Sequence, residues 1–130
     1  MNNAQPLIAV LDDEPQMRKA LGRLLRTHGF TVETWAEGAE MLRAFTQKAP
    51  DCLLLDLQMP GISGYEVMEN LHLWRLQVPV IIMTGHDEPH NFSRVMALGA
   101  SAYLTKPIDE LILLKALRRA LNGTPGIFPN

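Results

Sequence analysis

The most informative segment of the sequence is Cys52-Leu53-Leu54-Leu55-Asp56-Leu57-Gln58-Met59-Pro60-Gly61. It begins as an uninterrupted apolar run, with Pro50-Asp51 before it and Pro60-Gly61 after it. A short run of this kind is typical of a strand buried on both faces, in a parallel sheet that helices cover. The run ends on the carboxylate of Asp56. Because open parallel sheets bind ligands beyond the carboxyl ends of their strands, Asp56 is the first candidate for a functional residue.

Four other segments predict the remaining strands. Three of them are short and apolar. The fourth alternates polar and apolar residues and is rich in β-branched and aromatic side chains, which favours a strand at the edge of a sheet. The apolar segments are residues 7–11, 80–83 and 102–104, and the alternating segment is residues 30–35.

Five segments have apolar residues at the spacing of a helix that buries one face. The predicted helices span residues 15–28, 37–48, 64–73, 92–99 and 109–121. Pro15 suits a first helical turn, and we expect the acidic residue just before it to cap that helix. Asp109 is a good N-cap for the last helix, which Asn122-Gly123 ends.

Strands and helices therefore alternate along the chain, with short connections between them. This order predicts an α/β fold of three layers, in which a doubly wound parallel sheet of five strands has right-handed crossovers. The sequence contains no repeat and no internal linker, so we predict one domain over residues 1–123. Residues 124–130 contain two prolines and are expected to form a frayed end or the start of a linker.

The composition excludes several classes of function. A net charge of −2 leaves no basic surface of the kind that binds nucleic acid. Cys52 is the only cysteine, so no disulfide forms within the chain and a reducing compartment fits. The N-terminal residues do not resemble a secretory signal, and no apolar run approaches the roughly 18 residues of a membrane-spanning helix. We therefore expect a cytoplasmic domain that binds neither nucleic acid nor membrane.

Polar residues with distinctive chemistry follow four of the predicted strands. They are Asp12 and Asp13, Asp56, Thr84, and Lys106. Because parallel strands end at the same edge of a sheet, we expect these side chains to meet in one shallow pocket. Taken singly, each has an ordinary explanation: a helix cap, an Asx turn, a loop hydroxyl or a surface charge. Their occurrence together at strand ends favours a common site.

The chemistry of such a pocket is specific. Two carboxylates about 4 Å apart repel by about 4 kcal/mol at an effective dielectric near 20, so a cluster of three needs protons or a cation. Mg²⁺ is the hard cation that takes one or two carboxylates and a phosphate oxygen and keeps some of its waters. Together with a lysine and a hydroxyl, these groups are suited to the transfer of a phosphoryl group to a carboxylate.

From Ile8 to Asn122 the sequence resembles the bacterial response-regulator receiver domain. The resemblance depends on these residues: Asp12-Asp13, Asp56 with Met59-Pro60-Gly61 and Gly64, Thr84-Gly85, Tyr103, and Lys106-Pro107. The run from Met83 to His86 is most similar to receivers of the nitrogen-fixation and nitrate-response regulators. The resemblance implies a flavodoxin-like fold with strand order 2-1-3-4-5 and a cis peptide bond between Lys106 and Pro107.

The resemblance also implies roles for the residues of the pocket. Asp56 would accept a phosphoryl group from a phosphohistidine on a sensor histidine kinase or a phosphotransfer protein. Asp13 would bind Mg²⁺ directly, together with Asp56 and the backbone carbonyl of Gln58, and Asp12 would act through a coordinated water. Thr84 and Lys106 would contact the aspartyl phosphate. Such a domain is a switch and not an enzyme that turns over an external substrate.

In this family the output is a change of surface. Thr84 would move toward the phosphate, and Tyr103 would rotate from an exposed to a buried position. This changes the face of the fourth helix, fifth strand and fifth helix, where a partner protein, an output domain or a second copy binds. Gln58 and His86 would flank the path of an attacking water and so set the rate of dephosphorylation.

Three other functions are alternatives to a phosphorylated receiver. A hydrolase with an aspartyl-phosphate intermediate usually needs an acid two residues after the nucleophile, where this chain has Gln58. A flavin-binding electron carrier needs a phosphate-binding loop after the first strand, where Asp12, Asp13 and Glu14 repel a phosphate. A receiver-like module that binds partners without phosphorylation is disfavoured by the complete acidic set, but it stays open as an alternative.

Overall fold

The computed structural model describes residues 5–123, so the predicted tail at residues 124–130 lies outside it. Strands and helices alternate as the sequence predicts. The elements are β1 (Leu7–Leu11), α1 (Pro15–Thr27), β2 (Thr31–Trp35), α2 (Gly38–Phe45), β3 (Cys52–Asp56), α3 (Gly64–Leu73), β4 (Val80–Thr84), α4 (Asn91–Ala97), β5 (Ala102–Thr105) and α5 (Glu110–Leu121). None of the helices within this range is long and apolar enough to span a bilayer.

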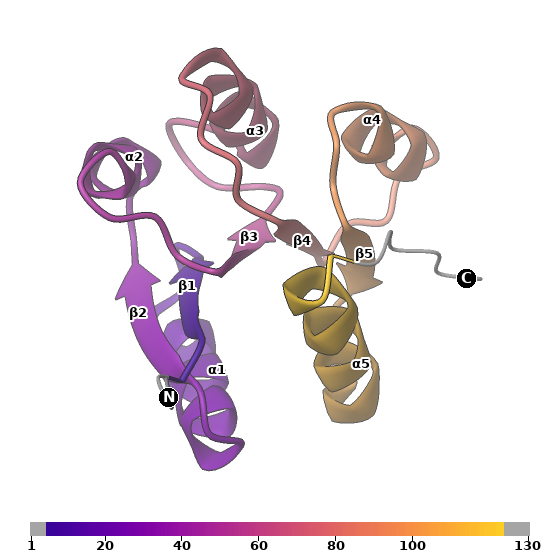
Figure 1. The fold of residues 1–130 in the computed structure, drawn as a ribbon. Helices are drawn as coiled ribbons and strands as arrows, with labels where there is room; N and C mark the ends of the chain where they lie inside the picture. Colours follow the sequence, from indigo (N-terminus) through magenta and orange to yellow (C-terminus); the bar gives the residue numbers. More distant parts are fainter. Residues whose placement is uncertain (1–4, 124–130) are drawn as a thin grey trace.

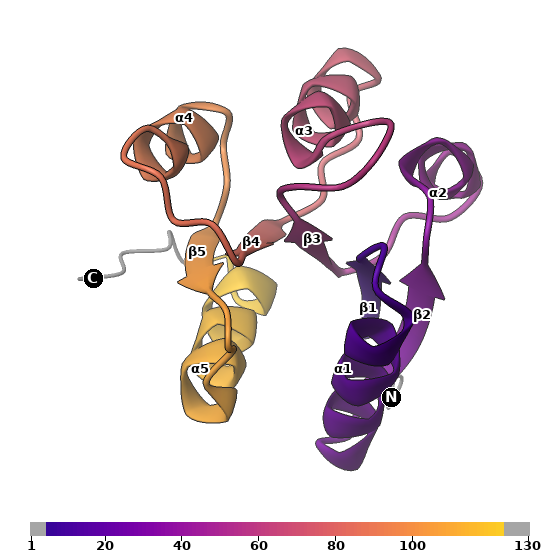
Figure 2. The ribbon, with the colours of Figure 1, turned by 180° about the vertical axis from the view of Figure 1, so that it is seen from behind.

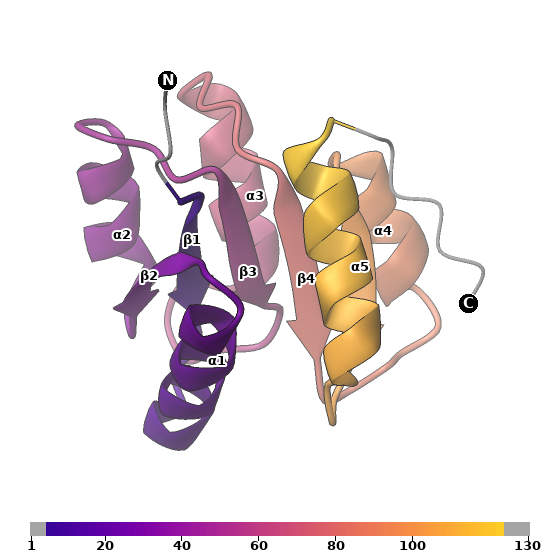
Figure 3. The same ribbon diagram turned by 60° about the horizontal axis from the view of Figure 1, so that its bottom comes forward.

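The strands form one parallel sheet in the order β2-β1-β3-β4-β5. Helices α1 and α5 cover one face of the sheet, and α2, α3 and α4 cover the other (Figure 1), as the view from behind also shows (Figure 2). The fold prediction is thus confirmed, including the edge position of β2. In Figure 3 the arrowheads of β1 to β4 point toward the same end of the sheet, where the predicted site residues follow.

Every residue of β1, β3 and β4 is buried, which explains why these strands lack polar alternation. Side chains that alternate along a strand enter two separate cores. Val10 and Leu54 belong to the core under α1 and α5, whereas Leu11 and Leu55 belong to the core under α2, α3 and α4. The three central strands are therefore held on both sides, and this fixes the positions of their carboxyl ends.

The helix ends agree with the sequence in part. The Asp109 side chain accepts the backbone N–H of Ile112 at 3.0 Å, as predicted for the cap of α5. The expected acidic cap of α1 is wrong, because the Glu14 side chain makes no capping hydrogen bond. Instead, Asp12 Oδ1 accepts the backbone N–H of Glu14 at 2.9 Å, which leaves this carboxylate in the turn between β1 and α1.

Gly64 begins α3 where the backbone returns to the end of β3. Its N–H donates to the carbonyl of Leu57 at 2.9 Å, and a Cβ added at this residue would lie 2.8 Å from the carbonyl oxygen of Asp56. We expect Gly64→Ala to lower the free energy of unfolding by about 1–2 kcal/mol. Overpacking against backbone costs about 1–3 kcal/mol, and the helix propensity of alanine returns at most about 1. Urea unfolding measures this change.

Gly22→Ala in α1 is a matched control. A Cβ at Gly22 would meet only the mobile end of the Arg26 side chain, at 3.1 Å. This variant should gain up to about 1 kcal/mol from helix propensity. If both variants changed stability equally, the contact between Gly64 and the β3 backbone would not be limiting.

Candidate functional site

Three charged side chains from different strand ends meet at the carboxyl edge of the sheet. Lys106 follows β5, and its Nζ lies 3.0 Å from Asp12 Oδ2 and 3.7 Å from Asp56 Oδ1. Asp12 follows β1 and is fully buried, and Asp56 ends β3 and is 4% exposed. The Lys106 ammonium therefore joins two buried carboxylates that are far apart in the sequence.

Lys106 and Asp56 border a pocket of about 290 Å³, here called the acidic pocket, and Asp12 lies buried behind its lining. Its lining consists of Asp13, Glu14, Asp56, Gln58, Gly85, His86 and Lys106. The predicted convergence of Asp12, Asp13, Asp56 and Lys106 is thus confirmed. Glu14 also approaches Lys106, with its Oε1 3.8 Å from Nζ, although from the sequence it is predicted only to cap a helix.

Asp12, Asp13 and Asp56 can each offer an oxygen within 4.8 Å of the other two. Within residues 5–123 this is the one group of three or more acidic, histidine or cysteine residues with ligand atoms so close together. All-oxygen ligands favour hard cations such as Mg²⁺ over zinc or copper. The donor set therefore fits a divalent cation, and the mutual repulsion of the carboxylates favours its binding.

The surroundings of Asp56 favour its protonated form. Burial raises the pKa of the Asp56 carboxyl from 3.8 to about 6, and the charge of Asp12 adds to this effect. Lys106 opposes it and lowers the pKa. Burial alone would lower the pKa of Lys106, but its hydrogen bond to Asp12 and the nearby charge of Asp56 outweigh burial and raise it. Lys106 thus keeps its positive charge beside a carboxyl that is costly to ionise.

Thr84 is brought to the same edge, but its hydroxyl is directed elsewhere. The side chain is 1% exposed and does not line the acidic pocket. Its Oγ1 accepts the backbone N–H of His86 at 3.0 Å and donates to the carbonyl of His86 at 3.1 Å. The hydroxyl is therefore bound to its own loop in this arrangement.

Gln58 and His86 both line the acidic pocket, in agreement with their predicted places beside it. The backbone N–H of Gln58 lies 3.4 Å from Asp56 Oδ1, at the long limit for a hydrogen bond. Both side chains are exposed to solvent.

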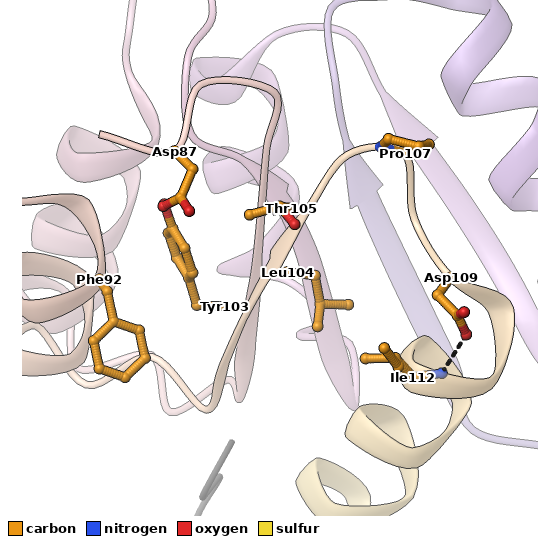
Figure 4. Close-up of a pocket in the computed structure, with 8 residues that line it drawn as sticks. All are labelled: Asp87, Phe92, Tyr103, Leu104, Thr105, Pro107, Asp109 and Ile112. Atoms are coloured by element: carbon orange, nitrogen blue, oxygen red, sulfur yellow. Dashed lines mark hydrogen bonds between the residues drawn. The ribbon is translucent and has the colours of Figure 1, made fainter. Parts of the chain in front are cut away.

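Tyr103 of β5 lies on the face formed by α4, β5 and α5 and is partly buried. Its hydroxyl donates to Asp87 Oδ1 at 2.7 Å, and its ring meets the Phe92 ring edge to face, with centroids 5.7 Å apart (Figure 4). Burial and then the bond to Asp87 raise the pKa of the Tyr103 phenol to about 12. These contacts border a second pocket of about 440 Å³ that is open to this face.

Sequence reasoning missed two features of the site. The Arg18 guanidinium of α1 donates to the backbone carbonyl of Asp12 at 2.7 Å and so supports the β1–α1 turn. Ser63 and Glu66 form a capping box at the start of α3, which fixes the end of the loop that follows Asp56. The Ser-x-x-Glu spacing would have indicated the second feature. His28 lies exposed on the surface, with its Nε2 2.9 Å from Glu110 Oε2.

Both the sequence and the fold of this chain resemble those of known proteins. The family model described as "Response regulator receiver domain" matches residues 8–118. Response regulator protein TodT of Pseudomonas putida is 34% identical over 125 residues, which are 96% of this chain and 55% of TodT. Transcriptional regulatory protein FixJ of Azorhizobium caulinodans is 34% identical over 114 residues, which are 88% of this chain and 54% of FixJ.

Among solved structures, the chemotaxis protein CheY4 of Vibrio cholerae aligns with a TM-score of 0.84 and 28% sequence identity, covering 91% of this chain and all of CheY4. The chain spans about half the length of TodT and FixJ. Because TodT and FixJ are equally similar, the nitrogen-fixation type of regulator is one relative among several. The relatives therefore do not single out the nitrogen-fixation and nitrate-response regulators, which the run from Met83 to His86 resembles.

Proposed function

Because the chain belongs to the response regulator receiver domain family, we propose that Asp56 is its phosphoacceptor. Receiver domains of response regulators act generally as signalling switches, and the role of this chain is in phosphorelay signalling. The observation that carries the proposal is the contact of one ammonium, Lys106, with both Asp56 and the buried Asp12. Asp56 is the carboxylate of this pair that also lines the acidic pocket.

The reaction is the transfer of a phosphoryl group from a phosphohistidine to Asp56. A carboxylate oxygen of Asp56 forms a bond to phosphorus, and the bond between phosphorus and the imidazole nitrogen breaks. The electron pair of that bond stays on the imidazole, which then takes up a proton. Lys106 neutralises negative charge on the phosphoryl oxygens. Stabilising this charge in the transition state is the main way in which a protein speeds phosphoryl transfer.

Asp12, Asp13, Asp56 and the backbone carbonyl of Gln58 would hold Mg²⁺. The close approach of the three carboxylates supports this set, since each can offer an oxygen within 4.8 Å of the others. A bound Mg²⁺ supplies positive charge that neutralises the phosphoryl oxygens. Asp12 already shares Lys106, so we expect it to act through a coordinated water and not as a direct ligand.

Thr84 is the residue that would report phosphorylation. Its hydroxyl has to leave the backbone of His86 before it can donate to a phosphoryl oxygen. We propose that this movement makes space for Tyr103 to rotate inward, which would require the hydroxyl of Tyr103 to leave Asp87. The face of α4, β5 and α5 then differs between the two states. The charge added at Asp56 by phosphorylation shifts the equilibrium between these two arrangements of the surface.

The proposed partners follow from this arrangement. The phosphoryl donor is a sensor histidine kinase or a phosphotransfer protein. The α4-β5-α5 face controls an output domain, a partner protein or a second copy that binds on phosphorylation. An output domain is consistent with relatives about twice as long as this chain. The domain acts on its own Asp56 and not on external substrates.

Mass spectrometry tests the proposed function directly. Incubation with acetyl phosphate and Mg²⁺ should add the mass of one phosphoryl group, and a chelator should prevent it. Asp56→Asn should remain unlabelled because the amide is not a nucleophile. Asp109→Asn is the matched control, since Asn caps α5 as well as Asp does. Labelling of Asp56→Asn, or no labelling of the wild type, would refute the assignment.

Gln58→Ala should slow the decay of the phosphorylated domain by about 2–10-fold. A glutamine beside the acceptor can orient the attacking water, and one lost hydrogen bond of about 0.5–1.5 kcal/mol corresponds to that range. Decay is followed after removal of acetyl phosphate. Gln16→Ala, which removes an exposed glutamine of α1, is the control. Equal decay rates in Gln58→Ala and wild type would show that the Gln58 side chain does not contribute.

A further inference from the structure

Asn91, the first residue of α4, is a buried polar side chain between two structural elements. It is 5% exposed, and its Nδ2 donates to the carbonyl oxygen of His86 at 2.8 Å. On its other side the Tyr65 hydroxyl of α3 donates to Asn91 Oδ1 at 2.5 Å. Buried polar groups are retained when their hydrogen bonds are made, so this side chain is fixed between α3 and the β4–α4 loop.

The Tyr65 bond sets the orientation of the Asn91 amide. A phenol donates to the amide oxygen, and this places the amide N–H groups toward His86, where a carbonyl needs a donor. With the amide reversed, two oxygens would face each other at His86. Tyr65 has a second contact with α4, because the Arg94 guanidinium lies 3.7 Å from the centroid of its ring. Asn91 and Arg94 are three residues apart, so one face of α4 meets Tyr65 twice.

The carbonyl oxygen of His86 receives three donors. They are the hydroxyl of Thr84 at 3.1 Å, the backbone N–H of Glu88 at 3.0 Å and the amide of Asn91 at 2.8 Å. The backbone N–H of His86 in turn donates to Thr84 Oγ1. Asn91 therefore holds the same peptide group that keeps the Thr84 hydroxyl away from the acidic pocket.

The same contacts lead back toward the proposed acceptor. Tyr65 directly follows Gly64, whose backbone lies close against the Asp56 carbonyl and donates to Leu57. A displacement of the backbone at Asp56 would thus press on Gly64, the residue directly before Tyr65. Tyr65 and Asn91 thus connect the segment that follows the acceptor strand to the backbone of His86, in the Thr84 loop.

We propose that Tyr65 and Asn91 form a latch that holds the Thr84 loop in its unphosphorylated arrangement. Both are positioning residues that act through His86. The proposal deepens the proposed function, since it states what opposes the movement of Thr84 toward a phosphoryl group on Asp56. Breaking the latch favours the state in which Thr84 is free to engage, and so strengthens the binding of a phosphoryl mimic.

Two variants break the latch at different atoms. Tyr65→Phe removes only the hydroxyl and keeps the ring beneath Arg94, and Asn91→Ala removes the amide. In the unmodified protein each should speed hydrogen exchange at the His86 amide by about 3–10-fold, the effect of one net hydrogen bond. With Mg²⁺ present, each should also tighten the binding of beryllofluoride, measured by calorimetry, by about 3–10-fold.

A double-mutant cycle separates a latch from a general loss of packing. Because Tyr65 acts through Asn91, the double variant should change beryllofluoride affinity no more than Asn91→Ala alone. Asn70→Ala on α3 is the control, since within residues 5–123 the Asn70 side chain makes no hydrogen bond. It should leave both exchange and affinity unchanged.

The outcomes distinguish the latch from the proposed function. If wild type fails to bind beryllofluoride, the proposed function fails, and His86 exchange still tests whether Tyr65 and Asn91 hold the loop. If wild type binds beryllofluoride and both variants bind it with the same affinity as wild type or more weakly, the latch is overturned. Additive effects of the two substitutions would overturn it as well, because the residues would then act independently.

Discussion

Replacing Lys106 with methionine should lower the free energy of unfolding by about 3 kcal/mol at pH 7.5 in a chelating buffer. Methionine keeps the length and apolar stem of lysine but removes the ammonium that lies 3.0 Å from the fully buried Asp12. Breaking a buried ion pair costs about 3–5 kcal/mol, because the remaining charge is left desolvated. The Lys106 side chain is 15% exposed, which places the effect at the lower end of this range.

The pairing can be tested by removing the opposite charge. Asp12→Asn in the Lys106→Met background should restore most of the lost stability, because no isolated charge is then buried. Lys19→Met on the exposed side of α1 is the control and should change stability by less than about 0.5 kcal/mol. If Lys106→Met were no more costly than Lys19→Met, the contact with Asp12 would not be an energetically significant ion pair.

Lys106→Met should also lower the rate at which acetyl phosphate phosphorylates the domain. Loss of one preorganised charge that faces a developing negative charge typically lowers a rate by about 10²-fold. The rate should be measured at saturating Mg²⁺ on protein shown to be folded under those conditions. A rate equal to that of wild type would remove Lys106 from the proposed mechanism while leaving its role in stability intact.

The sequence predicted the fold because most of its strand segments are continuous apolar runs. The apolar runs of β1, β3 and β4 lack alternation, and each is buried on both faces in the structure. Once these strands are parallel, the polar residues that follow them share one edge. This logic requires only chain order, so it correctly brought Asp12, Asp56 and Lys106 together.

What the sequence could not supply are the directions of side chains that have several possible partners. Thr84 was expected to face the pocket, but the backbone of His86 lies closer in the chain and takes up its hydroxyl. Tyr103 similarly pairs with Asp87, sixteen residues away. Such choices depend on loop conformation and on tertiary neighbours, and residue type alone does not encode them.

Asn91 illustrates the same limit. At the start of a predicted helix it reads as an ordinary polar residue, since asparagine is common near helix N-termini. Its burial and its bond to Tyr65, 26 residues away, appear only when α3 and α4 are packed side by side. A polar residue that is buried through tertiary contact gives no local periodic signal.

Replacing Asp56 with asparagine should raise the free energy of unfolding by about 2 kcal/mol at pH 7 in the presence of a chelator. Burial, and next the charge of Asp12, raise the pKa of Asp56 to about 6 in the folded protein, from 3.8 ordinarily. Each pKa unit corresponds to about 1.4 kcal/mol, so the full shift gives an upper limit near 3. Solvent at the mouth of the pocket reduces this value. Asparagine is never ionised and avoids the penalty.

The sign of the pH dependence follows from proton binding. Between about pH 4 and pH 6 folded Asp56 still holds a proton that the unfolded chain has released, so wild-type stability falls as the pH rises through this window. Asp56→Asn lacks this contribution, and its advantage over wild type should grow from near zero below pH 4 to its full value above pH 6. Subtracting the free energies of unfolding of the two proteins at each pH removes the contribution of all other titrating groups, because both proteins share them.

Mg²⁺ should reverse this order. A ligand that binds only the folded state stabilises it in proportion to the logarithm of its concentration over its dissociation constant. Wild type keeps all three carboxylates that can meet at the site, whereas Asp56→Asn keeps two. Adding Mg²⁺ at pH 7 should therefore raise the urea midpoint of wild type well above its value in chelator. The urea midpoint of Asp56→Asn should rise only a little. A variant that is less stable than wild type in chelator would contradict the inferred cost of ionising Asp56, because the folded state would then favour the carboxylate.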